Sequence, residues 1–205
     1  NPHELSMIES ISTQLSIPAY IMFRLKPGIE AHTHEYIKTG HIDSKFGMDF
    51  DEIMPLIRNV NNSTWGHFIG IHAHIGSQIF DDQPFYDLIT ILVNFIAKIK
   101  TTYGISVDEL NCGGGFGIQY LDSDQAPDIQ TVISKMANQL QLLCRSNNLT
   151  PPMLIFEPGR SIIATAGVTL YSVGSIKEIP KVKDYIFVDG GMADNPRPIM
   201  YQSEY

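Results

Sequence analysis

Helix-like and strand-like hydrophobic patterns alternate along the chain from residue 4 to residue 157. Apolar residues recur at every third or fourth position in some segments, as in amphipathic helices, and form short continuous runs in others, as in buried strands. The predicted order is a helix at 4–17, a strand at 19–25, a helix from about Asp51, a strand at 66–75, a helix at 84–103, a strand at 105–112, a helix at 128–145 and a strand at 153–156. Such alternation indicates an α/β fold with a parallel sheet, either open or closed into a barrel.

A different pattern begins after Arg160. Residues 165–179 and 185–188 predict two strands joined by the polar turn 180–184, with no helix between them. We therefore expect a first domain over residues 1–165 and the start of a β-rich domain over residues 166–205.

Composition narrows the classes of partner. The 205 residues carry a formal net charge of -8, which disfavours nucleic acid and anionic membrane surfaces. The longest apolar run, 88–99, is interrupted by polar residues, so no membrane span is predicted. Cys112 and Cys144 are too few for a disulfide scaffold, so we expect a reducing compartment, namely the cytoplasm, or a plastid if the source is a plant or alga.

Two glycine-bearing loops follow predicted strands. The first is Gly113-Gly114-Gly115, and the second is Glu157-Pro158-Gly159-Arg160. Loops without side chains bring backbone N–H groups close to an anion, most often phosphate. The first loop lacks the dinucleotide-binding spacing, and taken alone it is equally compatible with a flexible turn. Together, at the carboxyl ends of two buried strands, the loops predict one phosphate site.

Histidines occur in two closely spaced pairs. His72 and His74 lie two residues apart on a predicted strand and therefore on one face. They are compatible with buried core histidines, with a metal pair, or with one imidazole stacked on a flat cofactor ring. No third ligand follows with a recognisable metal spacing, so no metal site is expected. His32 and His34 lie in the long polar stretch 29–50, which favours an exposed loop.

Glu157 ends a predicted buried strand, where a carboxylate is unfavourable unless it is paired. One interpretation is an ion pair with Arg160. The other is that Glu157 faces the pyridine nitrogen of pyridoxal phosphate and keeps it protonated, which makes the ring a strong electron sink. Arg160 and Arg197 are cations whose forked donors suit carboxylates. Arg197, in a proline-flanked segment, is also compatible with an ordinary surface residue.

A set of motifs then converges on a known family. In chain order they are His74-Ile75-Gly76-Ser77-Gln78, Gly113-Gly114-Gly115-Phe116-Gly117, Glu157-Pro158-Gly159-Arg160-Ser161 and Asp189-Gly190-Gly191-Met192. Together they closely resemble the pyridoxal-phosphate-dependent decarboxylases with the alanine-racemase fold. Further segments are similar to the diaminopimelate decarboxylase subfamily, namely 26–34, Thr39-Gly40, Ser44-Lys45-Phe46-Gly47 and Arg197-Pro198-Ile199-Met200-Tyr201.

The resemblance implies a fold, a cofactor and residue roles. The fold would be the C-terminal half of a (β/α)8 barrel that binds pyridoxal 5'-phosphate, followed by the start of a β-rich domain. His74 would stack on the cofactor ring and Glu157 would pair with its nitrogen, which makes them the expected catalytic residues. The remaining cofactor-binding residues would be Ser77, Gly113, Gly114, Gly115, Gly159 and Arg160, and the substrate-binding residues would be Arg160, Arg197 and Tyr201.

The activity that this resemblance implies is decarboxylation of meso-diaminopimelate to L-lysine and CO2 by a homodimer. Related decarboxylases of ornithine, arginine or carboxynorspermidine are alternatives, as is a non-catalytic regulatory relative. An alanine racemase is disfavoured because that enzyme places an arginine at the ring nitrogen, where Glu157 stands here. The family's cofactor-linking lysine would precede Asn1 and its β-domain cysteine would follow Tyr205, so we expect a fragment that is inactive on its own.

Overall fold

The computed structural model describes residues 1–29 and 45–201 of the chain. The elements are α1 (Pro2–Leu15), β1 (Ala19–Arg24), α2 (Phe50–Asn61), β2 (Gly66–His72), α3 (Gln83–Tyr103), β3 (Glu109–Asn111), α4 (Ile129–Ser146), β4 (Met153–Ile155), α5 (Gly159–Ile163), β5 (Val173–Ile179), β6 (Lys183–Val188) and α6 (Arg197–Tyr201). The predicted loop with His32 and His34, and the motif Thr39-Gly40, lie outside the described residues.

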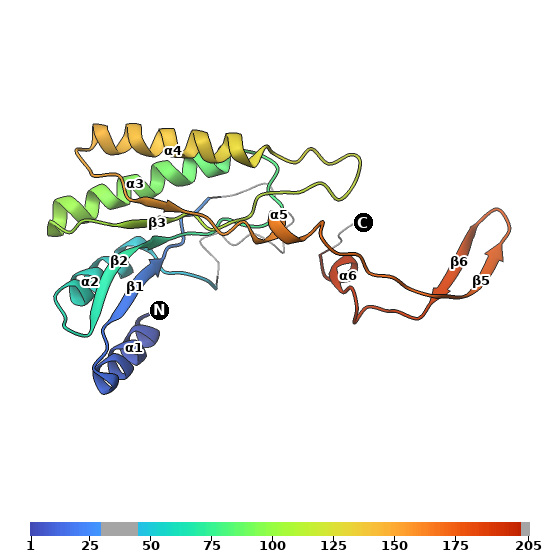
Figure 1. The fold of residues 1–205 in the computed structure, drawn as a ribbon, viewed down its shortest axis with the longest axis horizontal. Coiled ribbons are helices and arrows are strands. Elements are labelled where there is room, and N and C mark those ends of the chain that lie inside the picture. The colour runs from blue at the N-terminus through green and yellow to red at the C-terminus, as the bar shows by residue number, and fades with distance from the viewer. Residues whose placement is uncertain (30–44, 202–205) are drawn as a thin grey trace.

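A four-stranded parallel sheet in the order β1-β2-β3-β4 forms the centre of the molecule (Figure 1). Each strand pairs with the next strand in the sequence through a helical crossover. Because such crossovers share one hand, an order without reversal places the connecting helices on one face of the sheet. This is the arrangement of a barrel segment, whereas a doubly wound open sheet reverses its order. The expectation of an α/β fold is thereby confirmed.

The two faces of the sheet differ in burial. On β1, buried Ile21 and Phe23 alternate with Tyr20, Met22 and Arg24, which are exposed or half-buried. The buried side packs against the helices, whose apolar stripes supply most of the core. Core residues with no exposed surface are Ile53, Ile57, Val60, Ile71, Ala73, Ile75, Leu88, Ile89, Leu92, Val93, Ile99, Leu110, Val132, Met136 and Cys144. The other side is open, and the polar residues considered below lie on it.

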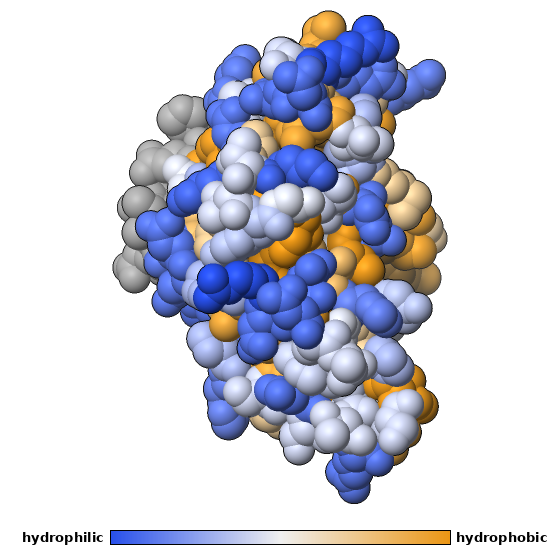
Figure 2. All heavy atoms as spheres, turned by 90° about the vertical axis from the view of Figure 1, so that its left-hand side faces the viewer, coloured by the Kyte–Doolittle hydropathy of each residue, from blue (hydrophilic) through white to orange (hydrophobic). Residues whose placement is uncertain are grey.

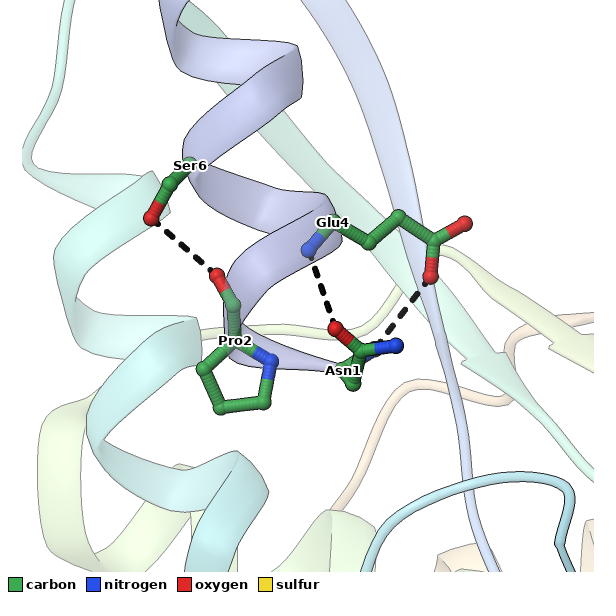
Figure 3. Close-up of polar contacts among 4 residues, drawn as sticks. All are labelled: Asn1, Pro2, Glu4 and Ser6. Atoms are coloured by element: carbon green, nitrogen blue, oxygen red, sulfur yellow. Dashed lines mark hydrogen bonds and ion pairs between the residues drawn. The ribbon is translucent and has the colours of Figure 1, made fainter.

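Local capping explains where several helices begin and end. The Asn1 side-chain oxygen accepts a hydrogen bond from the Glu4 amide at 3.0 Å, and Ser6 Oγ donates to Pro2 O at 3.1 Å (Figure 3). Asp49 is the N-cap of α2, and its amide donates to Glu52. Gly104 ends α3 with a left-handed φ of 72°, which a glycine adopts without strain.

Several predicted elements are shorter than expected. Helix α1 ends at Leu15, before Pro18, because Ser16 adopts a left-handed conformation. The strand expected at 105–112 is confined to Glu109–Asn111, and the strand expected from residue 165 begins only at Val173. As expected, no helix lies between β5 and β6, but two short helices that the pattern did not predict, α5 and α6, lie before and after them. Short helices lack the repeated apolar spacing by which sequence patterns reveal longer ones.

Strands β5 and β6 form an antiparallel hairpin that extends away from the parallel sheet (Figure 1). Its exposed apolar side chains are Val173, Ile176, Val182, Tyr185, Ile186, Phe187 and Val188. The hairpin agrees with the expected change to β structure. The domain boundary near residue 165 stays a prediction.

Figure 2 shows the molecule from the left-hand side of Figure 1. The surface on this side is mostly hydrophilic, with smaller hydrophobic areas between the polar residues. Within the described part of the chain, no helix is both long and apolar enough to cross a membrane.

Candidate active site at the carboxyl ends of the strands

A row of polar residues crosses the open face where the parallel strands end. The register aligns Arg24 with His72, His72 with Asn111, and Asn111 with Ile155. Glu157 follows Ile155 by two residues and belongs to the same face. The carboxyl ends of the four parallel strands are directed toward the side of the sheet where α5 lies (Figure 1). Residues far apart in the sequence therefore meet at these strand ends.

The carboxylate of Glu157 is bound by two neutral partners on adjacent strands. Asn111 Nδ2 donates to Glu157 Oε1 at 2.9 Å, and His72 Nε2 lies 3.2 Å from the same oxygen. The simplest sequence-based explanation, an ion pair between Glu157 and Arg160, is not found among the described contacts. The acid therefore belongs to a network that reaches across the sheet.

Asn111 connects this network to the glycine loop. Its Oδ1 accepts a hydrogen bond from the Gly113 amide at 2.8 Å while its Nδ2 reaches Glu157. The backbone of the two loops is also joined directly, since the Glu157 amide donates to Gly113 O at 2.7 Å. One side chain and one backbone bond thus hold the two predicted anion loops side by side.

The three glycines are needed because backbones approach each other closely. A Cβ on Gly113 would lie 2.7 Å from Ala73 O, one on Gly114 would lie 2.2 Å from Glu157 O, and one on Gly115 would lie 2.4 Å from Gly76 O. Gly113 and Gly115 also have φ values of 66° and 101°, which side chains disfavour. The flexible-turn interpretation is therefore wrong, since these glycines occupy a tightly packed position.

Some backbone amides of the glycine loop are used in hydrogen bonds inside the protein, and one is left for a ligand. Gly113 donates to Asn111, and Gly114 donates to His74 Nδ1 at 3.2 Å, so both are used inside the protein. Gly159 likewise donates to Glu157 O at 2.8 Å. Gly115 is half-buried, and its amide bonds no residue in the described part of the chain. Gly115 is therefore the amide of this loop that a phosphate could use.

Both site histidines are held in the neutral form. Burial lowers the pKa of His74 below its ordinary value of 6.5, and the charge of Arg24 lowers it further. Burial likewise lowers the pKa of His72, against the opposing influence of Glu157. Because Nδ1 of His74 accepts the Gly114 amide, its proton is on Nε2. A neutral imidazole in a fixed tautomer is thus available to stack on a flat ring.

Arg160 is fixed by residues from two other loops. Its Nε and one terminal nitrogen donate to Ser77 Oγ at 3.2 and 2.9 Å, and its other terminal nitrogen donates to the Tyr120 hydroxyl at 2.7 Å. Because Ser77 Oγ accepts both bonds, its own proton remains available for an anion. Ser77, Arg160 and the Gly115 amide therefore provide the donors for a phosphate or a carboxylate.

The remaining predicted substrate residues lie in α6. Arg197 begins this helix and Tyr201 ends it, and the Tyr201 side chain is outside the described part of the structure. Arg197 is half-buried, and its role in substrate binding stays a prediction. Within the described residues, no group of three or more His, Cys, Asp or Glu side chains could hold a metal ion.

These residues fit a phosphorylated pyridine ring. Glu157 supplies an acceptor for a ring N–H, and His74 supplies a neutral aromatic surface. Ser77, Gly115 and Arg160 supply anion donors. Sequence reasoning missed Asn111 and Tyr120, although Asn111 directly precedes the glycine loop, two residues before its first glycine.

We expect the histidines to make stability depend on pH. Their pKa values are lower in the folded than in the unfolded state, so unfolded chains bind more protons as the pH falls below about 6.5. The free energy of unfolding should therefore decrease between pH 7.5 and pH 5, and it should decrease less in a variant with both His72→Gln and His74→Gln. Denaturant unfolding at the two pH values measures this difference. An equal or larger decrease in the variant would contradict the assignment.

Comparison with known proteins places these features in a wider group. Residues 1–164 match the family model described as "Pyridoxal-dependent decarboxylase, pyridoxal binding domain". The diaminopimelate decarboxylase of Synechocystis sp. is 48% identical over 202 residues, which is 98% of this chain and 43% of that protein. The Bacillus subtilis enzyme of that name is 38% identical over 207 residues, covering 100% of this chain and 47% of that protein.

Solved structures agree with the sequence comparison. The Helicobacter pylori diaminopimelate decarboxylase complexed with L-lysine has a TM-score of 0.86 at 32% identity, over 99% of this chain and 48% of that chain. The M. jannaschii enzyme in complex with L-lysine has a TM-score of 0.87 at 35% identity, over 99% and 46%. The chain thus spans less than half the length of these relatives. Their likeness confirms the expected half barrel followed by β structure.

Proposed function

Since the chain belongs to the family of pyridoxal-dependent decarboxylases, we propose that the protein containing it removes CO2 from meso-diaminopimelate and releases L-lysine. Pyridoxal 5'-phosphate is the cofactor of this family. When bound, it supplies an electron sink for the pair left at Cα by the departing carboxylate. The observation that carries the proposal is the position of Glu157, held on the open face beside a neutral His74 and close to the anion donors.

Each site residue has a defined task in this proposal. Glu157 holds the proton on the ring nitrogen, and the imidazole of His74 covers one face of the ring. Gly115 and the Ser77 hydroxyl hold the phosphate. The backbones of Gly113, Gly114 and Gly159 shape the loops around it.

Substrate recognition depends on the arginines. Arg160 and Arg197 bind substrate carboxylates together with Tyr201, because guanidinium groups match carboxylates through paired donors. Arg160 is held beside the anion site by Ser77 and Tyr120 before any ligand binds. A dicarboxylic, diamino substrate is favoured over one ending in an ammonium group, which would call for an acidic partner at its far end. The names of the similar enzymes, two of them in complex with L-lysine, support the same substrate.

We propose further that the working protein is a cytoplasmic homodimer, or a plastid one in a plant or alga. The exposed apolar side chains of the hairpin β5–β6 support association, since such residues mark interaction surfaces. Gel filtration with light scattering measures the mass directly.

The test of function uses the complete protein that contains this chain, purified with its cofactor. We expect L-lysine and CO2 from meso-diaminopimelate, and no CO2 from L-ornithine or L-arginine. Turnover of ornithine or arginine instead would indicate a related decarboxylase. Cofactor binding without turnover of any of these substrates would indicate a regulatory relative.

A further inference from the structure

A single oxygen of Glu157 takes both of its side-chain contacts. Asn111 Nδ2 at 2.9 Å and His72 Nε2 at 3.2 Å both reach Oε1. No residue in the described part of the chain bonds Oε2, and the Glu157 side chain is 54% exposed. The carboxylate is therefore anchored through one oxygen and presents the other to the open face.

Asn111 cannot exchange the two ends of its amide. Its Oδ1 accepts the Gly113 N–H at 2.8 Å, so its Nδ2 must face Glu157. A flipped amide would place a donor against the Gly113 N–H and an acceptor against a carboxylate oxygen. The glycine loop thus determines which group of Asn111 meets Glu157.

His72 is similarly restricted. Its side chain is 14% exposed and lies between Arg24 and Asn111 in the register of the sheet. Because an ionised carboxylate only accepts hydrogen bonds, His72 must keep its proton on Nε2. A permanent cation at this position would offset the negative charge of the carboxylate and so weaken its attraction for a proton in the site. A neutral donor orients the carboxylate and leaves that charge in place.

We propose that His72 and Asn111 are positioning residues, which hold Glu157 by Oε1 so that Oε2 faces the ring nitrogen of the cofactor. This inference rests on the proposed function, in which Glu157 pairs with that nitrogen. Neither residue touches the cofactor in this assignment. Each acts through the orientation of Glu157, so its loss should affect interactions of the ring nitrogen and spare those of the phosphate.

The test compares two cofactors in the complete protein. We would measure the dissociation constants of pyridoxal 5'-phosphate and of its 1-deaza analogue, in which a C–H group replaces the ring nitrogen. The parent protein should bind the natural cofactor more tightly than the analogue. His72→Leu removes one donor. Asn111→Asp keeps the acceptor for the Gly113 amide but replaces the donor with an oxygen.

In both variants, the ratio of the two dissociation constants should fall about tenfold toward equal binding. A change of this size corresponds to the free energy of one hydrogen bond to a charged group. His72→Gln, whose amide nitrogen can replace Nε2, should restore most of the preference. His67→Leu is the matched control, because His67 lies on the same strand, is exposed and has its ring beside that of Tyr20, with no contact to Glu157. Its preference should equal that of the parent protein.

Two results would overturn the inference alone. One is an equal loss of affinity for both cofactors, which indicates a merely structural role. The other is an unchanged preference in His72→Leu and Asn111→Asp. If His72→Leu does not fold, Asn111→Asp, which preserves side-chain volume, decides the outcome. A parent protein without any preference would overturn the pairing of Glu157 with the ring, and this inference with it.

Discussion

Replacing Glu157 by glutamine should lower kcat about a thousandfold, within the range for loss of a group that controls a proton. The contacts of Glu157 explain why the effect should be large. Asn111 and His72 both donate to Oε1, so the amide oxygen of the glutamine must take that position. Its NH2 group then replaces Oε2 and becomes a donor toward the ring. A ring nitrogen facing a donor has to give up its own proton, and the electron sink weakens.

The measurement is the rate of CO2 release from meso-diaminopimelate at saturating substrate, with cofactor content checked by absorbance. Glu109→Gln is the matched control. Glu109 lies on β3, where its register partner is Met153, and no side-chain bond joins it to the described network. Its kcat should stay within about twofold of the parent value. A Glu157→Gln variant within tenfold of the parent would mean that the carboxylate does not control the ring proton.

Replacing Gly114 by alanine should destabilise the protein by about 3 kcal/mol, the upper part of the range for a group forced into a packed site. The added Cβ would lie 2.2 Å from Glu157 O, which is a backbone atom and cannot move aside as a flexible side chain does. The two loops would separate, and the Gly114 bond to His74 would be distorted. The melting temperature should fall by roughly 10 °C.

Gly167→Ala is the control for this prediction, because a Cβ at Gly167 meets nothing within 4 Å. Thermal unfolding followed by circular dichroism should show a change of at most about 2 °C for this variant. Equal melting temperatures for the Gly114 and Gly167 variants would show that the loops can move apart without cost.

Elements with a strong local signal were predictable from sequence. The apolar periodicity of 84–103 and Gly104 at its end define α3, and Asp49 marks the start of α2. The motifs also indicated that Gly113–Gly115 and Glu157 lie at one site. These features depend on residues close together in the chain, where spacing determines which face a side chain occupies.

The contacts within the site were less predictable because they join distant segments. Asn111 and Glu157 are 46 residues apart, and Arg160 reaches across 83 residues to Ser77. No local pattern shows that Arg160 binds Ser77 and Tyr120 rather than Glu157. Nor does it show that two of the three glycine amides are already bonded inside the protein. Such pairings follow from the register of the sheet, which the sequence pattern alone does not determine.

The order of the parallel strands has a consequence for synthesis on the ribosome. Since each strand pairs with its predecessor in the chain, the sheet can grow in the direction in which the polypeptide emerges, without waiting for a distant partner. His72 and Asn111 are then in place before β4 arrives and brings Glu157 to them. A nascent chain interrupted before Ile155 would display both donors without the acid they hold. The ability to bind the ring nitrogen would therefore arise in one step, when the last strand of the parallel sheet docks.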